Sequence, residues 1–149
     1  TKENFLSPSE DVKTEGNYTG LIIDCSEFDL KPVLAPVIRN ADNLSVYSYT
    51  NLDRDKIISR GVVDYAINKT PALIGTRAFL LDSSDNLIDL SRAGDNPLII
   101  NALALSDDGT CPVVSTEDAD KILAENQASN FLDNGAVVFT SYRVGGLRA

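Results

Sequence analysis

The side chains best suited to chemistry are carboxylates that follow an apolar run near the start of the chain. Asp24 comes directly after GLII, Glu27 lies three residues later, and Asp29 lies two residues further on. Such a group can supply a general acid and a general base, or flank a sugar bond in a hydrolase, if the fold turns two carboxylates toward one another. A carboxylate at the end of a strand more often caps a turn. We therefore expect no catalytic residue here, and a carboxylate-based hydrolase or carbohydrate-active domain is the alternative.

Five further aspartates lie in two turn-like stretches and raise the question of a calcium site. They are Asp82, Asp85 and Asp89 in DSSDNLIDL, and Asp107 with Asp108 in SDDGT. Calcium needs several oxygen ligands from a closely spaced loop. Neither stretch matches the D-x-D-x-D-G pattern with its distal Glu. The sequence predicts solvated turns and no metal site, with a calcium-stabilised domain as a further hypothesis.

The chain contains no histidine, which removes the commonest general base and the commonest transition-metal ligand together. Zinc sites and His-based triads are therefore excluded. Lys56 and Ser59 have a spacing that suits Ser–Lys chemistry, but a charged helix face is expected to turn the lysine to water. A phosphate loop is also missing, because AGDN at 93–96 holds one glycine and the pair at 145–146 has no helix after it. No cofactor is expected.

The two cysteines, Cys25 and Cys111, lie far apart and follow no CxxC or metal-ligand spacing. One disulfide between them would indicate an oxidising compartment. Two unpaired thiols are the simpler expectation. Cys25 follows an apolar strand and is flanked by Asp24 and Glu27, whose negative charges raise a thiol pKa. The sequence therefore predicts an inert thiol at this position.

The composition describes one acidic domain. A chain of 149 residues with 43% hydrophobic residues can bury a single core, and its formal charge of −9 repels nucleic-acid backbones. Residues 1–17 are polar and are expected to be a flexible lead-in, with residues 18–149 as the single domain. No apolar run is long enough to span a bilayer. The chain starts with Thr1 rather than Met, so we expect a trimmed protein.

The elements that must position these side chains alternate irregularly between strands and helices. A buried strand is expected at 19–24, and a hairpin with arms 33–39 and 44–49 is expected around the turn-forming residues 40–43. Because Pro36 cannot donate to a ladder, the first arm should be an edge or carry a bulge. Further strands are expected at 62–67, 98–105, 111–115 and 136–142.

Two short helices are expected. One runs through NLDRDKIISRG, with Asn51 or Asp53 as N-cap, Ile57 and Ile58 as its buried edge and Gly61 as its end; the other begins at Ser115. Within residues 71–90, the run PALIGTRAFLL fits either a helix or a strand. We favour a helix or irregular segment there, followed by a short extended piece. These elements predict an α+β fold with a mixed, mainly antiparallel sheet and two or three short helices.

Three stretches carry a resemblance to a known group of proteins: YTGLIIDCSEFDLKPVLAPVIRN, DRDKIISRGVVDYA and RAGDNPLIINALAL. They resemble small bacterial envelope lipoproteins related to the flagellar H-ring assembly protein T, whose pattern reads TGLIIDARGLGLKPALSPRI and later R-x-G-x-NPLVIKA. Residues 25–29 depart from that pattern, and the lipobox of such proteins is absent from this chain. Any membrane attachment would therefore need an anchor that this chain does not carry.

The resemblance implies an exported, periplasmic or outer-membrane-associated module that binds or scaffolds another envelope protein. A flagellar or outer-membrane assembly role is one possibility within it. Its pattern holds no catalytic residues to carry over, so the expected function is non-enzymatic. No nucleic-acid partner is expected.

Overall fold

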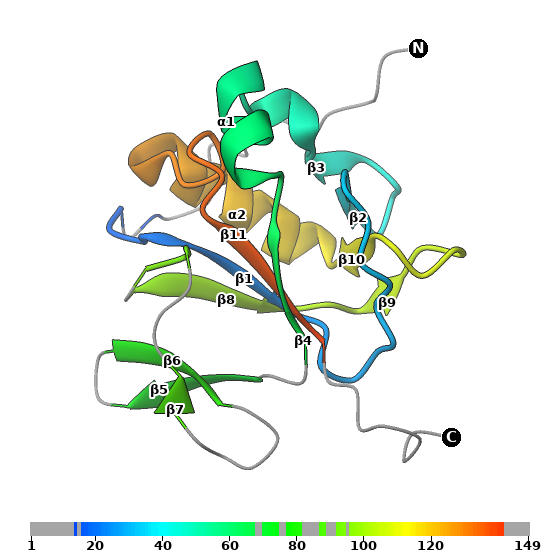
Figure 1. Ribbon diagram of the computed structural model, residues 1–149, viewed down its shortest axis with the longest axis horizontal. Helices are drawn as coiled ribbons and strands as arrows, with labels where there is room; N and C mark the ends of the chain where they lie inside the picture. The colour runs from blue at the N-terminus through cyan, green and yellow to red at the C-terminus, as the bar shows by residue number, and fades with distance from the viewer. Residues whose placement is uncertain are drawn as a thin grey trace.

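A four-stranded parallel sheet forms the centre of the protein (Figure 1). The computed structural model describes residue 14 and residues 16–67, 70–74, 77–81, 87–88, 92–94 and 96–141. The strand order is β4 (Asp64–Ile67), β11 (Val137–Ser141), β1 (Gly20–Asp24) and β8 (Pro97–Asn101). The α+β class predicted from the sequence is confirmed, but this sheet is parallel throughout rather than mainly antiparallel. Parallel strands are buried on both faces, which fits the apolar runs of β1 and β11.

A second sheet has mixed strand directions and the order β3 (Ser45–Tyr47), β2 (Ile38–Asn40), β10 (Pro112–Val114) and β9 (Ala104–Leu105). The predicted hairpin between β2 and β3 is confirmed, with a shorter first arm, because residues 33–37 form a loop. Asn40 organises its turn, since its Oδ1 accepts hydrogen bonds from the backbone N–H groups of Asp42 and Leu44, both at 2.9 Å. The predicted irregularity is present as a register shift between Ile38 and Arg39.

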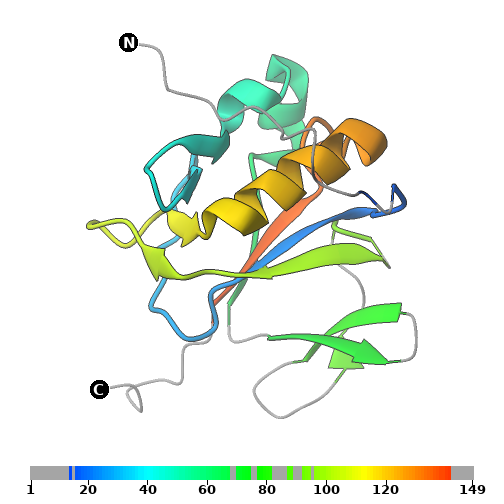
Figure 2. The ribbon, with the colours of Figure 1, turned by 180° about the vertical axis from the view of Figure 1, so that it is seen from behind.

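A third, antiparallel sheet consists of β5 (Thr70–Ile74), β6 (Arg77–Leu81) and β7 (Leu87–Ile88). The helix or irregular segment expected within 71–90 was therefore wrong for β5 and β6. Short apolar runs cannot be assigned to helix or strand by periodicity alone, and here the hairpin pairing of β5 with β6 decides. Figures 1 and 2 show this sheet on the opposite side of the central sheet from helix α2 (Thr116–Ser129).

The helices begin where the sequence places their caps. Helix α1 (Arg54–Arg60) follows Asp53, whose Oδ1 accepts from the N–H of Lys56, and it ends at Gly61 with φ +73°. A 3-10 turn, η1 (Tyr49–Asn51), precedes it. Ser115 caps α2 as predicted. The buried edge expected on α1 was wrong for Ile58, which is 73% exposed, while Ile57 is half-buried. Adjacent helix positions point about 100° apart, and on this seven-residue helix only Ile57 of the two isoleucines points in a direction that is partly covered.

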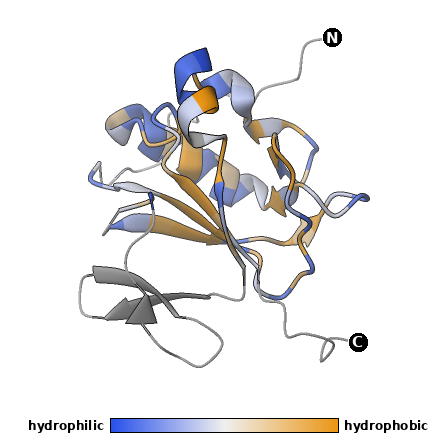
Figure 3. Ribbon diagram, in the orientation of Figure 1, coloured by the Kyte–Doolittle hydropathy of each residue, from blue (hydrophilic) through white to orange (hydrophobic). Residues whose placement is uncertain are grey.

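The main core lies between α2 and one face of the central sheet. Ala119, Ile122 and Leu123 of α2 belong to the same buried cluster as Leu21 and Ile23 of β1. Figure 3 shows the apolar colouring concentrated on the central strands. A smaller cluster, with Ile22, Ala66, Ala93 and Val138, occupies the other face.

Two further predictions concern the strand at 98–105 and the flexible lead-in at 1–17. The single strand predicted at 98–105 is divided into β8 and β9. Residues 1–13 and 15 of the predicted flexible lead-in lie outside the described residues. Gly16 donates its N–H to the buried Glu125 at 3.0 Å, and the carbonyl of Asn17 accepts from Asn96 at 3.0 Å, so these two residues are bound to the fold. Within the described ranges, no helix is long and apolar enough to cross a membrane.

Candidate functional site

The carboxyl ends of adjacent parallel strands form a polar pocket, which we call the Asp24 pocket. Asp24 ends β1 and Asn101 ends β8, and the two are direct register partners. The pocket has a volume of about 260 Å³ and is lined by Asp24, Ser26, Glu27, Asn101 and Ala102. Ligands of open parallel sheets often bind at this edge. The structure thus places both Asp24 and Glu27 in the lining of one pocket, while Asp29 is not among its lining residues.

Asp24 is held by its own turn. Its Oδ1 accepts a hydrogen bond from the N–H of Ser26 at 3.0 Å and another from Oγ1 of Thr140 on β11 at 3.0 Å. The carbonyl of Cys25 accepts from the N–H of Phe28 at 2.9 Å, which closes the turn. Asp24 therefore caps a turn at the end of a strand, which was the simpler interpretation of its position.

The two cysteines are unpaired, as predicted. Cys25 is fully buried, and this burial, followed by the charge of Asp24, raises the pKa of its thiol to about 12. The predicted direction of the thiol pKa is confirmed, although burial is the larger cause and Asp24, rather than both predicted carboxylates, supplies the charge. A thiol with such a pKa is almost entirely protonated at neutral pH, and only the thiolate is a strong nucleophile. Cys111 is half-buried and contacts the hydroxyl of Thr110 at 3.4 Å.

The turn between β9 and β10 contains one of the two predicted aspartate stretches. Oδ1 of the exposed Asp108 accepts from Oγ of Ser106 at 2.6 Å and from Oγ1 of Thr110 at 2.8 Å. These hydrogen bonds lower the pKa of the Asp108 carboxyl. Asp82, Asp85 and Asp89 lie outside the described residues. In the part of the chain that the structure describes, no three carboxylates or thiols are grouped so that they could hold a metal ion.

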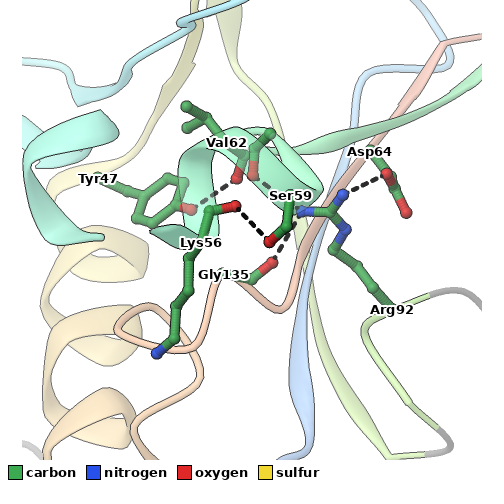
Figure 4. A network of polar contacts seen from close by, with 8 residues as sticks. Tyr47, Lys56, Ser59, Val62, Asp64, Arg92 and Gly135 are labelled. Carbon is green, nitrogen blue, oxygen red and sulfur yellow. Dashed lines mark hydrogen bonds and ion pairs between the residues drawn. The ribbon is translucent and has the colours of Figure 1, made fainter. Parts of the chain in front are cut away.

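Lys56 and Ser59 do not form a Ser–Lys pair. Oγ of Ser59 donates to the carbonyl of Asp55 at 2.9 Å, one turn earlier on the same helix. Nζ of Lys56 instead donates to the carbonyl of Asp133 at 3.0 Å. Figure 4 shows the ammonium group turned away from Ser59.

Arg92 makes a clamp that the sequence analysis missed. Its Nη1 donates to the carbonyls of Gly61 at 3.3 Å and Gly135 at 3.2 Å, while its Nη2 forms an ion pair of 2.6 Å with Asp64 (Figure 4). The Arg92 side chain is only 10% exposed. These contacts join the start of β4 to the loop before β11. No local signal identifies such a residue, since its partners lie about 30 to 45 positions away along the chain.

An apolar groove lies beside the start of β4, and we call it the Val33 groove. It has a volume of about 340 Å³ and is lined by Pro32, Val33, Leu34, Gly61, Val62, Val63 and Tyr65. Val33 is 39% exposed and Leu34 is 95% exposed. The sequence analysis placed Val33 and Leu34 in a strand. The signal that could have identified the loop was the short run VLA, residues 33–35, between prolines at positions 32 and 36.

Tyr65 fixes the loop that forms one wall of this groove. Its hydroxyl accepts from the N–H of Val33 and donates to the carbonyl of the same residue, each at 3.1 Å. The Tyr65 ring is itself held by an edge-to-face contact with Phe139, with ring centres 5.7 Å apart. Burial raises the pKa of the Tyr65 hydroxyl, so it keeps the proton that it donates. One residue earlier than Pro32, the N–H of Lys31 donates to the carbonyl of Gly109 at 2.8 Å.

A family model matches most of the chain. The family model for the second domain of Treponema pallidum Tp0624 matches residues 20–141, from the first residue of β1 to the last residue of β11. The chain belongs to this family. No curated protein sequence matches the chain. The matched range contains both the Asp24 pocket and the Val33 groove, so each is built entirely from the part of the chain that the family defines.

Proposed function

We propose that this domain is a non-enzymatic protein-binding module of the bacterial envelope and that it docks on a partner protein through the Val33 groove. The observation that carries the proposal is the 95% exposure of Leu34 at the rim of an apolar groove. Apolar side chains that are fully exposed beside a concave apolar surface are typical of protein interaction sites.

The loop that presents Leu34 is restrained before any partner binds. Hydrogen bonds fix the backbone of Lys31 and Val33, and two prolines flank the loop. A preorganised loop loses little conformational entropy on binding. Complete burial of a leucine side chain contributes about 1.5 to 3 kcal/mol, which is enough to change an affinity by more than tenfold.

The location in the envelope rests on the sequence resemblance to envelope lipoproteins related to the flagellar H-ring assembly protein T. An assembly role, flagellar or at the outer membrane, is the process that this resemblance favours. The formal charge of −9 supports a protein partner over a nucleic acid. Fractionation of cells that produce the full-length protein tests the location, and recovery in the cytoplasmic fraction alone would refute it.

The docking proposal is tested by capture of a partner from a solubilised envelope fraction. The tagged domain is compared with Leu34→Asp and with the matched control Ile58→Asp, which alters an exposed residue of α1 that does not line the groove. We expect one stoichiometric partner with the wild type and the control, and at least about a tenfold loss with Leu34→Asp. Equal recovery by all three proteins would refute the groove as the docking site.

A carboxylate-based hydrolase is the second candidate function, because Asp24 and Glu27 line the same pocket. The two donors already bound to Oδ1 of Asp24 favour a structural role for it instead. The test is hydrolysis of a panel of aryl glycosides and esters by the wild type and by the Asp24→Asn, Glu27→Gln double variant. We expect no turnover by either protein. Turnover that the double variant abolishes would establish the hydrolase.

A further inference from the structure

We infer that the partner binds as an extended segment that adds a strand to the outer edge of β4, with apolar side chains in the Val33 groove and positively charged side chains on the opposite face. This inference rests on the proposed protein-binding function and specifies its mode and the chemistry of its partner.

No strand that the structure describes pairs with the outer edge of β4. β4 is the terminal strand of the central sheet, and its described residues pair only with β11. Such an edge presents backbone N–H and C=O groups in the spacing that an incoming strand requires. The groove lies beside this edge, since Val63 and Tyr65 belong both to its lining and to the segment that enters and forms β4.

The alternation of side chains along β4 specifies what an added strand would meet on each face. Val63 and Tyr65 lie on the face of the main core, where the groove is. Asp64 and Ala66 point to the other face, where Ala66 packs in the smaller cluster and Asp64 binds Arg92. Successive residues of a strand point to opposite faces. An added strand therefore places every second side chain against the groove and the intervening ones beside Asp64.

The charge of Asp64 and of the chain as a whole indicates which side chains an added strand would place on the face opposite the groove. Asp64 keeps 49% of its side chain exposed although its Oδ1 is bound to Arg92. With a formal charge of −9 for the chain, the surface favours a segment that alternates apolar residues with Lys or Arg.

Two other occupants fit less well. A second copy of this chain brings another charge of −9 to the same surface, so self-association is opposed by repulsion. An amphipathic helix satisfies its own backbone groups and so makes no use of the open edge of β4. An extended basic segment is the occupant that matches the groove, the edge and the charge together.

The experiment selects short random peptides on the immobilised domain and maps the enriched sequences by amide chemical shifts. We expect apolar residues alternating with Lys or Arg, shift changes at residues 62–67, and binding that is weaker by about tenfold or more in Leu34→Asp but unchanged in Ile58→Asp. Methylating the peptide nitrogens that face β4 should abolish binding. Methylating the intervening nitrogens should leave it unchanged, because those N–H groups point away from the edge.

Each other outcome overturns the inference in a recognisable way. Peptides that bind the groove regardless of which nitrogens are methylated refute strand addition but leave the docking surface in place. Acidic or helical consensus sequences refute the proposed partner chemistry. If no peptide is enriched, or all of them bind away from residues 62–67 and Leu34, the inference fails, and the capture of an envelope partner decides separately whether the proposed function fails too.

Discussion

Replacing Arg92 by methionine tests whether the clamp around Gly61 holds the start of β4 in place. Methionine keeps most of the length and apolar stem of the side chain but donates no hydrogen bond. The change leaves the carbonyls of Gly61 and Gly135 without the guanidinium that now binds them, and it removes the ion pair with Asp64. Each acceptor left without its partner costs about 1 to 3 kcal/mol when it is buried.

The expected loss in the free energy of unfolding depends on how exposed each of the three partners of Arg92 is. Gly135 is buried, Gly61 is half-buried, and Asp64 is half-exposed, so its ion pair contributes less than about 1 kcal/mol. We expect Arg92→Met to lower the free energy of unfolding by about 2 to 4 kcal/mol. At this chain length the loss corresponds to a fall in melting temperature of roughly 4 to 16 °C.

Urea denaturation followed by circular dichroism measures the effect, with Lys56→Met as the matched control. Lys56 is also a long cation that donates to a backbone carbonyl, but its contact with Asp133 is exposed, and its loss should cost less than about 0.5 kcal/mol. Arg92→Lys should recover only part of the loss, since an ammonium group cannot reproduce the fork of donors. If Arg92→Met unfolds within about 0.5 kcal/mol of the wild type, the clamp contributes nothing and the reasoning is refuted.

Three further predictions concern the core and a helix cap. The folded state favours the neutral Cys25 thiol, whose pKa rises from 9.0 to about 12, so its contribution to stability is complete below about pH 9 and is lost as pH rises toward 12. In urea denaturation, the free energy of unfolding should fall by about 1.4 kcal/mol per pH unit above pH 9, and this fall should be absent in Cys25→Val. Both proteins carry Cys111→Ser, so that Cys25 is the one cysteine that differs between them. A Cβ on Gly20 would lie 2.5 Å from Cα of Ala93, so Gly20→Ala should destabilise the fold by more than about 2 kcal/mol in the same assay. If this variant is as stable as the wild type, the backbones at Gly20 and Ala93 separate easily and the prediction is wrong. Ser115→Ala removes the cap of α2 and should cost about 1 kcal/mol, whereas Ser115→Asp should cost little; equal losses in thermal unfolding would contradict the capping role.

The sequence predicted those features that depend on neighbouring residues. The cap Ser115, the Asn40 turn and the end of α1 at Gly61 were identified, and Asp53 was one of two candidate caps, because each is a contact between residues a few positions apart. The buried character of β1 and the raised pKa of the Cys25 thiol followed from local apolar and charged surroundings. The segments of β5 and β6 were assigned wrongly, because a short apolar run satisfies both periods and only its strand partners distinguish them, whereas the short extended piece predicted after them is present as β7.

The tertiary structure alone decided the direction of the strands and the surfaces proposed to be functional. The parallel order of β4, β11, β1 and β8 joins segments that lie between residues 20 and 141, and it places Asp24 directly beside Asn101. The Val33 groove exists because Tyr65 binds a residue 32 positions earlier in the chain. Local sequence determines which short elements form, because their hydrogen bonds and caps are satisfied within a few residues. Grooves and clamps arise from packing between distant segments, whose partners no local pattern specifies.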